Sequence, residues 1–482
     1  MPQIVIFLVA VTFAAAQEAS RHDQSGVQLA QAGNLAAAIE QFRAALRLDP
    51  NYAEAWYHLA LAYNQSQKTD EAMAGFEEAL RLRSDYVEAR YMLADCCRKR
   101  GDFVGELSLL EEVVKEAPRF AEAHYNYGLA LKNRQMPQAA VEELRSSVRL
   151  SPGNHKYLLA LGIALADVNK KEAVKILRDA VERDGANADT HYNLGLALAT
   201  DGDDMAAVQA FHRAVELNAK HTSAWRALGV TLLHQNKLEE SSTAFRRALE
   251  MAPKDAEAAN NLGTVQLRLK DIQGAIETLD RAIESNPNLI KAHANLAQAY
   301  QRAGRTADAQ RESERVAALT AEQRNRGQAM VLVDSAEQQR KARQTVQAIS
   351  TLHRAIEASP GFADAHFQLG RLIRDSGGNP DDAIASFRRV LRLDPERAEA
   401  HYEIGVTLER AGRKTDALEE YRIAVDMAPC HVEAKQALAR AALDAREWST
   451  AATQFRGVLA VQPKNADAKN GFQRAITSEG KF

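Results

Sequence analysis

The sequence is poor in cysteine and in aromatic residues. Three cysteines occur among 482 residues, and phenylalanine, tryptophan and tyrosine make up 6 % of the chain. Three cysteines cannot build the disulfide framework that replaces a hydrophobic core in small secreted domains. The chain must therefore fold by burying apolar side chains, and its many alanines favour helices whose backbones pack closely.

An excess of charge of either sign is also absent. Lysine and arginine number 61, aspartate and glutamate number 64, and the formal net charge is -3. No long run of basic residues stands out, whereas nucleic-acid-binding proteins usually carry a basic stripe. We therefore expect no nucleic-acid partner.

Long apolar runs are missing except near the N-terminus. Residues 4–16 read IVIFLVAVTFAAA, a run too short to span a bilayer but suited to the core of a signal peptide. We predict a signal peptide at residues 1–16, cleaved after Ala16, and export to a periplasmic or extracellular compartment. No lysine or arginine precedes the run, so a leading hydrophobic helix in a cytoplasmic protein remains the alternative. No later run reaches eighteen apolar residues, so no transmembrane segment is expected in the mature chain.

Prolines recur at a fixed spacing. The interval from Pro118 to Pro152 is the same as that from Pro395 to Pro429 and that from Pro429 to Pro463. A constant period of this length, about 34 residues, indicates an array of repeated helical units rather than several globular domains.

Residues 398–431 show one period of this pattern. They place a glycine and a leucine in a first helix, a glycine in a turn, small and aromatic residues in a second helix and a proline after it: Gly405, Leu408, Gly412, Ala417, Tyr421, Ala424 and Pro429. The pattern resembles the tetratricopeptide repeat (TPR) family, over about thirteen repeats. The resemblance implies an all-α fold, a right-handed α-solenoid superhelix of stacked antiparallel TPR helix pairs.

Two residues of this unit illustrate why the pattern specifies packing. A glycine inside a helix costs about 1 kcal/mol relative to alanine, so we expect Gly405 to lie where a neighbouring helix approaches closely. Tyr421 is predicted to fill the space between the small residues of the second helix.

The period divides the chain into two arrays. Residues 17–323 are predicted to hold repeats 1–9, residues 329–465 to hold repeats 10–13, and residues 466–482 to form a C-terminal capping helix and tail. Residues 324–328 exceed the period and are predicted to be an irregular junction, either an extended helix or a hinge at Gly327. The expected repeat starts are Ala19, Ala53, Val87, Ala121, His155, Ala188, Thr222, Ala256, Ile290, Ala329, Ala363, Ala398 and Val432.

Motifs that would carry catalysis are missing. The sequence has no P-loop, no G-x-S-x-G and no H-E-x-x-H. We therefore predict no enzyme activity, no catalytic residues, no cofactor and no metal ligands. Five histidines share one early position of the first helix in different repeats, which predicts a periodic packing role: His124, His191, His293, His366 and His401.

The three cysteines are expected to be unpaired. Cys96 and Cys97 occupy positions that are apolar in other repeats, and adjacent cysteines rarely pair with each other, so we predict small buried side chains. Cys430 follows Pro429 in a turn and is predicted to be an exposed, neutral surface residue. A free thiol or an intermolecular bridge is the alternative for Cys430.

The TPR resemblance implies that the first helices line a concave ligand-binding face. There, tyrosine offers apolar area with a hydroxyl group, and asparagine offers a donor and an acceptor, as an extended peptide requires. The predicted peptide-binding residues are Tyr57, Tyr91, Tyr125, Asn126, Tyr192, Asn193, Arg226, Asn260, Asn261, Asn295, Gln298, Phe367, Arg371 and Tyr402. The alternative is that tyrosine followed by asparagine is simply frequent at these repeat positions.

The function that the resemblance implies is a non-catalytic protein–protein interaction scaffold that binds protein or peptide partners in the concave groove. Two alternatives stay open. One is a regulatory or substrate-recruiting subunit of a separately encoded enzyme, such as an O-linked sugar transferase-like system. The other is an envelope assembly factor that self-associates through exposed repeat ends.

Overall fold

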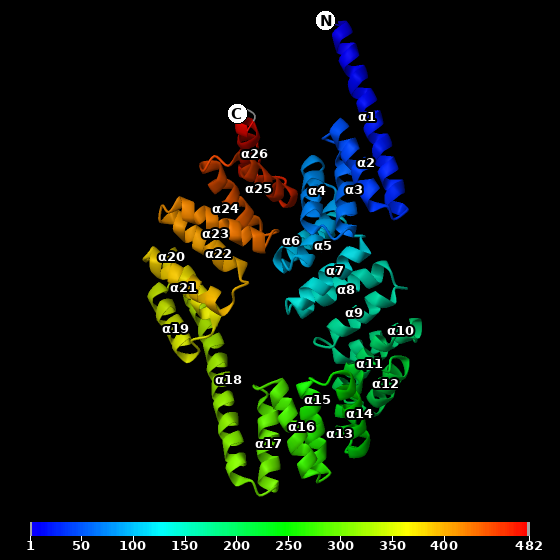
Figure 1. Cartoon of the computed structure of the whole chain (residues 1–482), viewed down its shortest axis with the longest axis vertical. Coiled ribbons are helices and arrows are strands. Elements are labelled where there is room, and N and C mark those ends of the chain that lie inside the picture. The colour runs from blue at the N-terminus through cyan, green and yellow to red at the C-terminus, as the bar shows by residue number, and fades with distance from the viewer. Residues whose placement is uncertain (1, 480–482) are drawn as a thin grey trace. The chain divides into compact units, whose positions relative to one another are not determined.

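The fold consists of α-helices. The computed structural model describes the backbone of residues 2–479 and the side chains of residues 15–478, and within that range every regular element is an α-helix (Figure 1). The helices form two compact units, Met1–Ala130 with Val331–Phe482 (unit 1) and Leu131–Met330 (unit 2). The predicted all-α class is confirmed.

Two series of helices make up the units. Those that begin in unit 1 are α1 (Pro2–Gln31), α2 (Leu35–Leu48), α3 (Ala53–Gln65), α4 (Thr69–Leu82), α5 (Val87–Lys99), α6 (Phe103–Glu116), α7 (Ala121–Asn133), α19 (Thr345–Ala358), α20 (Ala363–Asp375), α21 (Pro380–Leu393), α22 (Ala398–Arg410), α23 (Lys414–Met427), α24 (Val432–Asp444), α25 (Trp448–Val461) and α26 (Ala466–Glu479). Those that begin in unit 2 are α8 (Pro137–Leu150), α9 (His155–Leu165), α10 (Lys170–Arg183), α11 (Ala188–Asp201), α12 (Asp204–Leu217), α13 (Thr222–His234), α14 (Leu238–Met251), α15 (Ala256–Arg268), α16 (Ile272–Ser285), α17 (Ile290–Arg302) and α18 (Thr306–Lys341).

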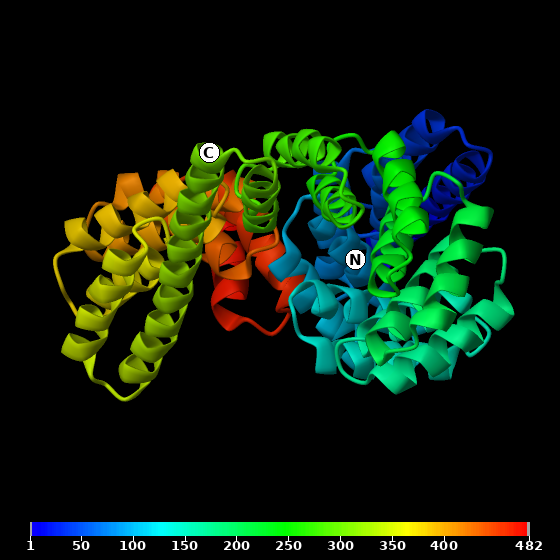
Figure 2. The same ribbon diagram turned by 90° about the horizontal axis from the view of Figure 1, so that it is seen from below.

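Most predicted repeats begin where a helix begins. The first residues of α3, α5, α7, α9, α11, α13, α15, α17, α20, α22 and α24 are the predicted repeat starts. The exceptions are Ala19 and Ala329, which lie inside the longer helices α1 and α18. Within each unit the two helices of a repeat pack as an antiparallel pair, for example α11 with α12 and α22 with α23 in Figure 1; Figure 2 shows the same fold from below.

Glycines in the first helices make the close approach that the sequence predicts. A Cβ atom on Gly405 would lie 2.5 Å from Cε1 of Tyr421, and Tyr421 is fully buried. Ala417 and Ala424 flank it, each 1 % exposed. The tyrosine ring therefore occupies the space that the small residues leave, and burying such a ring stabilises the pair by about 2–3 kcal/mol.

Gly412 ends the first helix of the same repeat. Its φ of 78° lies in the left-handed region, where a side chain would be strained, and its amide donates to the carbonyl of Glu409. The predicted helix break at Gly412 is therefore present.

The segment 324–328 is helical. It lies inside α18, which runs without interruption from Thr306 to Lys341, so its backbone has the extended-helix form, one of the two forms that the sequence left open. The helix is rich in alanine, glutamine, glutamate and arginine and contains no proline, which favours a continuous helix. Nothing lies within 4 Å of a Cβ atom built on Gly327. The division of the chain into arrays remains a prediction.

Both ends of the chain carry predictions that the structure covers in part. The backbone of residues 2–16 belongs to α1, while Met1 and the side chains of residues 1–14 lie outside the described residues. The predicted signal peptide therefore remains a prediction. The predicted capping region contains α26, and residues 480–482 lie outside the described residues.

The prediction that the cysteines are unpaired is wrong for two of the three, although Cys97 is buried as predicted. Cys97 and Cys430 form a disulfide across 333 positions of sequence, and Cys430 is 5 % exposed rather than on the surface. Both residues lie in unit 1, where α4 also packs against α25. Cys96 alone matches the expectation, because it is buried and free. The repeat pattern describes neighbours along the chain, so it contains no signal for a contact between distant repeats.

Candidate peptide-binding groove

A hollow of about 410 Å³ opens on the first helices of three successive repeats in unit 2. Its lining comes from α11, α13 and α15, and Phe211 of α12 also contributes. The lining residues are Tyr192, Leu196, Ala199, Phe211, Ser223, Arg226, Ala227, Val230, Thr231, His234, Glu257 and Asn261. This face is the one that the TPR resemblance implies for ligands.

One part of the hollow is apolar. Tyr192, Val230 and Leu196 line it, and Leu196 is 37 % exposed, a large value for a leucine in a packed helical array. The ring of Tyr192 stacks on that of His221 at 4.8 Å, which fixes its orientation. The hollow thus offers a rigid apolar surface for one or two side chains of a ligand.

The polar part of the hollow is held in place by a helix cap. Arg226 forms an ion pair with Asp255 at 3.2 Å, and Asp255 caps α15 by accepting from the amide of Ala258 at 3.0 Å. The Arg226 side chain remains 38 % exposed, so it is positioned without being enclosed. Glu257 and Asn261 add an acceptor and an amide on the next helix.

Three predicted asparagines form a connected network. Nδ2 of Asn295 donates to Oδ1 of Asn260 at 2.9 Å and to Oγ1 of Thr264 at 2.9 Å. Nδ2 of Asn260 in turn donates to Oδ1 of Asn261 at 3.4 Å. Asn260 is 2 % exposed, so its side chain links α15 to α17 and is covered by protein. Of the three, only Asn261 lines the hollow.

Most residues of the predicted aromatic row contact the residue just before the next repeat. Ring centroids of Tyr57 and Tyr86 lie 4.8 Å apart, those of Tyr91 and Phe120 lie 4.9 Å apart, and those of Tyr402 and His431 lie 5.3 Å apart. In each pair the second residue precedes the first helix of the following repeat. Burial raises the pKa of the Tyr57, Tyr125 and Tyr402 hydroxyls, so these groups stay protonated. Packing between repeats is therefore one established role of the row.

The sequence contains a signal for these stacks. One and the same sequence separation joins Tyr57 to Tyr86, Tyr91 to Phe120, Tyr192 to His221, and Tyr402 to His431. Phe367 belongs to the repeat that has one extra residue in its turn, so its partner, Arg397, comes one position later. The guanidinium of Arg397 lies 4.2 Å from the ring centroid of Phe367. An aromatic or cationic residue at this spacing would have identified the stacks.

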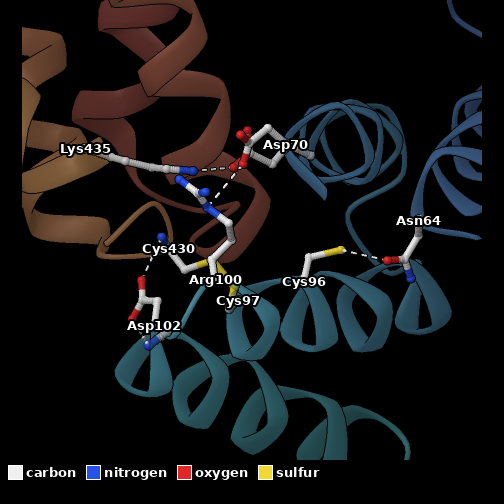
Figure 3. The surroundings of a disulfide bond; sticks show 10 residues. Asn64, Asp70, Cys96, Cys97, Arg100, Asp102, Cys430 and Lys435 are labelled. Carbon is white, nitrogen blue, oxygen red and sulfur yellow. Dashed lines mark hydrogen bonds and ion pairs between the residues drawn. A yellow bond between two sulfur atoms is a disulfide. The ribbon is translucent and has the colours of Figure 1, made fainter. Parts of the chain in front are cut away.

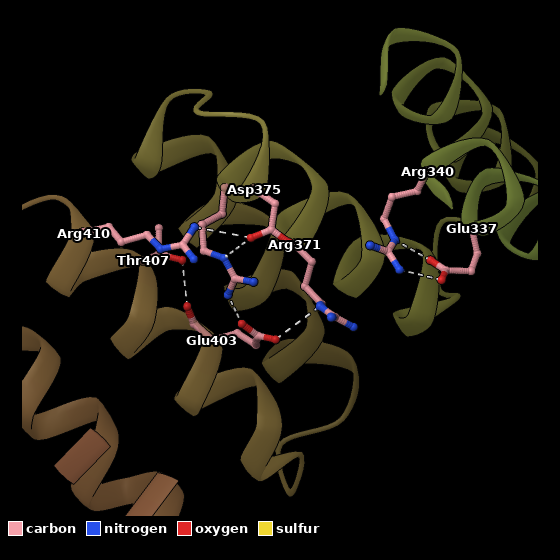
Figure 4. Close-up of polar contacts among 8 residues, drawn as sticks. Glu337, Arg340, Arg371, Asp375, Glu403, Thr407 and Arg410 are labelled. Atoms are coloured by element: carbon pink, nitrogen blue, oxygen red, sulfur yellow. Dashed lines mark hydrogen bonds and ion pairs between the residues drawn. The ribbon is translucent and has the colours of Figure 1, made fainter. Parts of the chain in front are cut away.

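Arg371 takes part in an ion-pair network of unit 1 (Figure 4). Its Nε lies 3.3 Å from Glu403, which also pairs with the buried Arg374, and Arg410 lies 3.4 Å from Asp375. Nearby on α18, hydrogen bonds from Arg340 lower the pKa of Glu337. The arginines of this face are therefore mostly neutralised by carboxylates.

The structure brings three of the predicted groove residues together at the hollow, Tyr192, Arg226 and Asn261. Asn193 donates to the backbone carbonyl of Asp189 at 2.8 Å, and Gln298 is exposed on α17. In unit 1, Asn126 donates to the hydroxyl of Tyr91. The binding role of all fourteen residues stays a prediction.

Four of the five periodic histidines share one contact. Ring Nε2 atoms of His191, His293 and His366 lie 3.0, 3.0 and 3.1 Å from the carbonyl oxygen six residues earlier, and Nε2 of His124 lies 3.2 Å from the equivalent carbonyl. This contact ties the helix to the preceding turn. Among residues 15–478, no three histidine, cysteine, aspartate or glutamate side chains gather as a metal ion would require.

A membrane-crossing helix is not found in the described part of the chain. None of the helices there combines the length and the apolarity that a bilayer requires.

Comparisons with known proteins give one curated relative and several solved structures. A BBSome complex member, the BBS4 homolog of Drosophila melanogaster, is 28% identical over 165 residues, which is 33% of this chain and 34% of that protein. The chain thus matches about a third of the length of that relative.

Three solved structures are similar to part or all of the chain. MamA from Desulfovibrio magneticus is 24% identical, with 34% of this chain and 94% of that chain covered and a TM-score of 0.33. YrrB, described as a TPR protein with an unusual peptide-binding site, is 24% identical, with coverages of 38% and 95% and a TM-score of 0.32. A chain of the APC/C hetero-tetramer Cut9–Hcn1 is 15% identical, with coverages of 96% and 98% and a TM-score of 0.36.

Models of a repeat family match along most of the sequence. A model described as "Tetratricopeptide repeat" matches residues 107–155, 159–219, 202–242, 227–290, 372–429 and 437–471, more than half of the chain. Further models of the same repeat match residues 26–66, 53–86 and 278–311. These matches agree with the helix pairs and with the glycine–aromatic contacts between their helices. The chain belongs to the tetratricopeptide repeat family.

Proposed function

We propose that this protein is a non-catalytic scaffold that binds a peptide or an extended segment of a partner protein. The observation that carries the proposal is the hollow on α11, α13 and α15, where first helices of three repeats combine apolar and polar side chains. Membership of the TPR family supports a role in protein interaction in general. The partner is defined here by its chemistry only.

The side chains of the hollow favour a particular class of ligand. Tyr192, Leu196 and Val230 would receive an apolar side chain, and Asn261 would pair with a peptide group beside it. Arg226 and Glu257 carry opposite charges within the same hollow, so neither a strongly acidic nor a strongly basic ligand is favoured. We therefore propose an extended, nearly neutral segment with one apolar anchor residue.

A matched pair of charge insertions tests this site. Leu196→Glu places a carboxylate in the apolar part of the hollow, and Met205→Glu makes the same change at a position of α12 that is 67 % exposed and does not line the hollow. Peptides would first be selected against residues 17–482 from a displayed library, and their dissociation constants then measured for each variant.

We expect Leu196→Glu to weaken binding at least tenfold and Met205→Glu to leave it unchanged. Equal affinities for the two variants would refute the assignment of the hollow. Circular dichroism serves as the folding control, because both substitutions lie at positions that are already exposed. Alanine at Tyr192 is a poorer test, since its ring also stacks on His221.

We also propose that the chain is exported. The apolar run at residues 4–16 has the length of a signal-peptide core, and a buried disulfide is typical of oxidising compartments. Alkaline phosphatase fused after residue 20 provides the test, because this enzyme is active only after its own disulfides form in an exported, oxidising compartment. Activity that depends on residues 4–16 supports export, and inactivity in a cell with a working secretion pathway contradicts it.

A further inference from the structure

A seam inside unit 1 joins α4, α5 and α6 to α24 and α25 (Figure 3). Asp102 lies at its centre and has two partners. Its Oδ1 caps α6 by accepting from the amide of Gly105 at 2.9 Å, and its Oδ2 accepts from the backbone amide of Cys430 at 2.8 Å. One buried carboxylate thus holds the start of a helix and the turn of a repeat more than 300 positions away.

The seam has no room at Gly105. A Cβ atom built there would overlap the Cβ atom of Cys430. Any other residue would therefore push the turn that carries Cys430 away from Cys97. The absence of a side chain at Gly105 and the carboxylate of Asp102 together bring the two sulfur atoms into bonding reach.

A buried ion pair lies beside the disulfide. Lys435 of α24 and Glu77 of α4 pair with side-chain exposures of 8% and 7%. The absence of a side chain at Gly457 of α25 makes room for Lys435, because a Cβ atom there would lie 2.5 Å from the Lys435 nitrogen. Around this pair, Arg456 lies 3.6 Å from Glu78, and Arg100 donates to the carbonyl of Asp426 at 3.2 Å.

The apolar part of the seam is small. Among the described side chains of the C-terminal repeats, Cys430, Ala460 and Val461 are those that join the hydrophobic cluster formed by the N-terminal repeats. A buried ion pair contributes little net stabilisation, because desolvation of the two charges offsets most of their attraction. The sulfur–sulfur bond is therefore the strongest connection in the seam.

We infer that the seam is a thiol-controlled clasp, in which oxidation of Cys97 and Cys430 locks α4–α6 to α24–α25 and reduction frees these helices from each other. The state of the clasp then follows the balance of thiols and disulfides in the surroundings of the protein. The inference stands independently of the proposed peptide groove, which lies in unit 2.

Closure is a thiol–disulfide exchange with a disulfide donor such as glutathione disulfide. One of the two cysteines, as thiolate, attacks a sulfur of the donor and releases one glutathione thiolate. The other cysteine thiolate then attacks the resulting mixed disulfide and releases the second. Two protein thiols and one donor disulfide thus become one protein disulfide and two glutathione thiols, which take up the two protons.

Cys96 is kept out of this exchange. Its sulfur is buried and lies 3.9 Å from Oδ1 of Asn64, facing away from the seam partner of Cys97 (Figure 3). Burial raises the pKa of the Cys96 thiol to about 12, so little of the reactive thiolate forms. A disulfide between Cys96 and Cys430, in place of the one from Cys97, is thereby disfavoured.

Hydrogen exchange of the full chain tests the clasp. Peptides covering α4 and α25 would be followed by mass spectrometry in the oxidised protein, after reduction with dithiothreitol, and after reoxidation with glutathione disulfide. We expect exchange in these peptides to be at least tenfold faster in the reduced protein and to return to the original rate on reoxidation. Peptides of α13 and α14 in unit 2 serve as the internal reference and should not change.

Two variants separate the clasp from general effects of reduction. Cys430→Ser should show fast exchange in α4 and α25 under oxidising conditions, whereas Cys96→Ser should behave as the oxidised wild type. Equal exchange in the oxidised and reduced wild type would overturn the inference, because the seam would then hold without the bond. The wild-type comparison remains decisive if Cys430→Ser does not fold.

Discussion

A Cβ atom on Gly195 would lie 2.5 Å from Cε1 of Phe211, so the first and second helices of this repeat touch through a position that tolerates no side chain. Gly195→Val should therefore overpack the contact and lower the free energy of unfolding by about 1–3 kcal/mol. The gain in helix propensity from glycine to valine, less than about 0.5 kcal/mol, offsets only a small part of this cost. Urea unfolding followed by circular dichroism measures the change.

The matched control for this substitution is Gly153→Ala in the same unit. Nothing lies within 4 Å of a Cβ atom at Gly153. Its free energy of unfolding should change by less than about 0.5 kcal/mol, as at most surface positions. Equal unfolding midpoints for the two variants would mean that the helix contact at Gly195 is not tight.

Gly327→Ala should stabilise the protein. Gly327 lies inside α18 with nothing within 4 Å of its Cβ position, so alanine adds helix propensity without a clash. We expect a gain of about 0.5–1 kcal/mol in thermal or urea unfolding. Gly304→Ala is the contrasting variant, because its φ of 76° disfavours a side chain and should make that variant less stable. A loss of stability at Gly327 would contradict a regular helix through residues 324–328.

Glu106 should make stability depend on pH. Burial raises the pKa of its carboxyl to about 6, although Arg98 opposes the shift, and the residue is 7 % exposed. Since the unfolded pKa is lower, near 4.3, the folded state binds more protons between these values. Stability should therefore fall as pH rises from about 4.5 to 6, and the loss, at most about 2 kcal/mol, is complete above that range.

Glu106→Gln removes this titration. We expect the variant to be more stable than the wild type at pH 7 and similar to it at pH 4, measured by urea unfolding across the range. Glu111→Gln, on the exposed side of the same helix α6, is the control and should follow the wild-type curve. Parallel curves for wild type and Glu106→Gln would show that Glu106 ionises freely in the folded protein.

Cys96 should be nearly inert in the folded protein. With a pKa of about 12 instead of 9.0, its thiolate fraction at pH 8 falls by about a thousandfold. N-ethylmaleimide should therefore modify the oxidised chain at least a hundredfold more slowly in buffer than in guanidinium chloride. Cys96→Ser should take up no reagent in either solution. Fast modification of the native chain would place Cys96 at the surface.

The ion pair of Glu77 and Lys435 should show strong coupling between its members. Because each is buried, Glu77→Leu or Lys435→Met alone leaves an unpaired charge in the seam, and each should cost about 3–5 kcal/mol. The double variant Glu77→Leu with Lys435→Met should recover most of that loss. Urea unfolding of the oxidised protein gives the four values of the cycle.

An exposed pair on the same array provides the comparison. Lys414 and Asp444 lie 2.8 Å apart with side-chain exposures of 69% and 61%, so Lys414→Met should produce no measurable change. Additive effects of the two single variants at Glu77 and Lys435 would contradict their pairing.

Relations along one repeat could be read from the sequence, whereas relations between distant repeats could not. Ala398 begins a helix, and Gly405 lies where the neighbouring helix comes close, as predicted, because both depend on positions within a single repeat period. The bond from Cys97 to Cys430 spans 333 positions, and no periodic pattern encodes such a distance. The aromatic row was predicted as a ligand surface. Its packing role was missed because each ring contacts the residue just before the next repeat, outside the unit whose pattern was read.

The sequence predicted which face of the array would carry the candidate groove, but not which residues would line a hollow on it. The period places Tyr192, Arg226 and Asn261 on first helices, and these three do meet at the hollow of unit 2. Asn260 occupies an equivalent face but is covered, because Asn295 reaches across to bond it. Such side-chain pairing depends on the identity of each neighbour, which the repeat pattern does not fix.

The bond between Cys97 and Cys430 also determines how the protein responds to mechanical force. If the chain is pulled by its two ends, tension passes through residues 1–97, across the sulfur atoms and through residues 430–482. The segment between the cysteines, including all of unit 2, bears no load while the bond lasts. Reduction would release 333 positions of chain, on the order of 1,000 Å of extension at about 3.5 Å per residue. Stretching single molecules with and without a reductant would register that length directly.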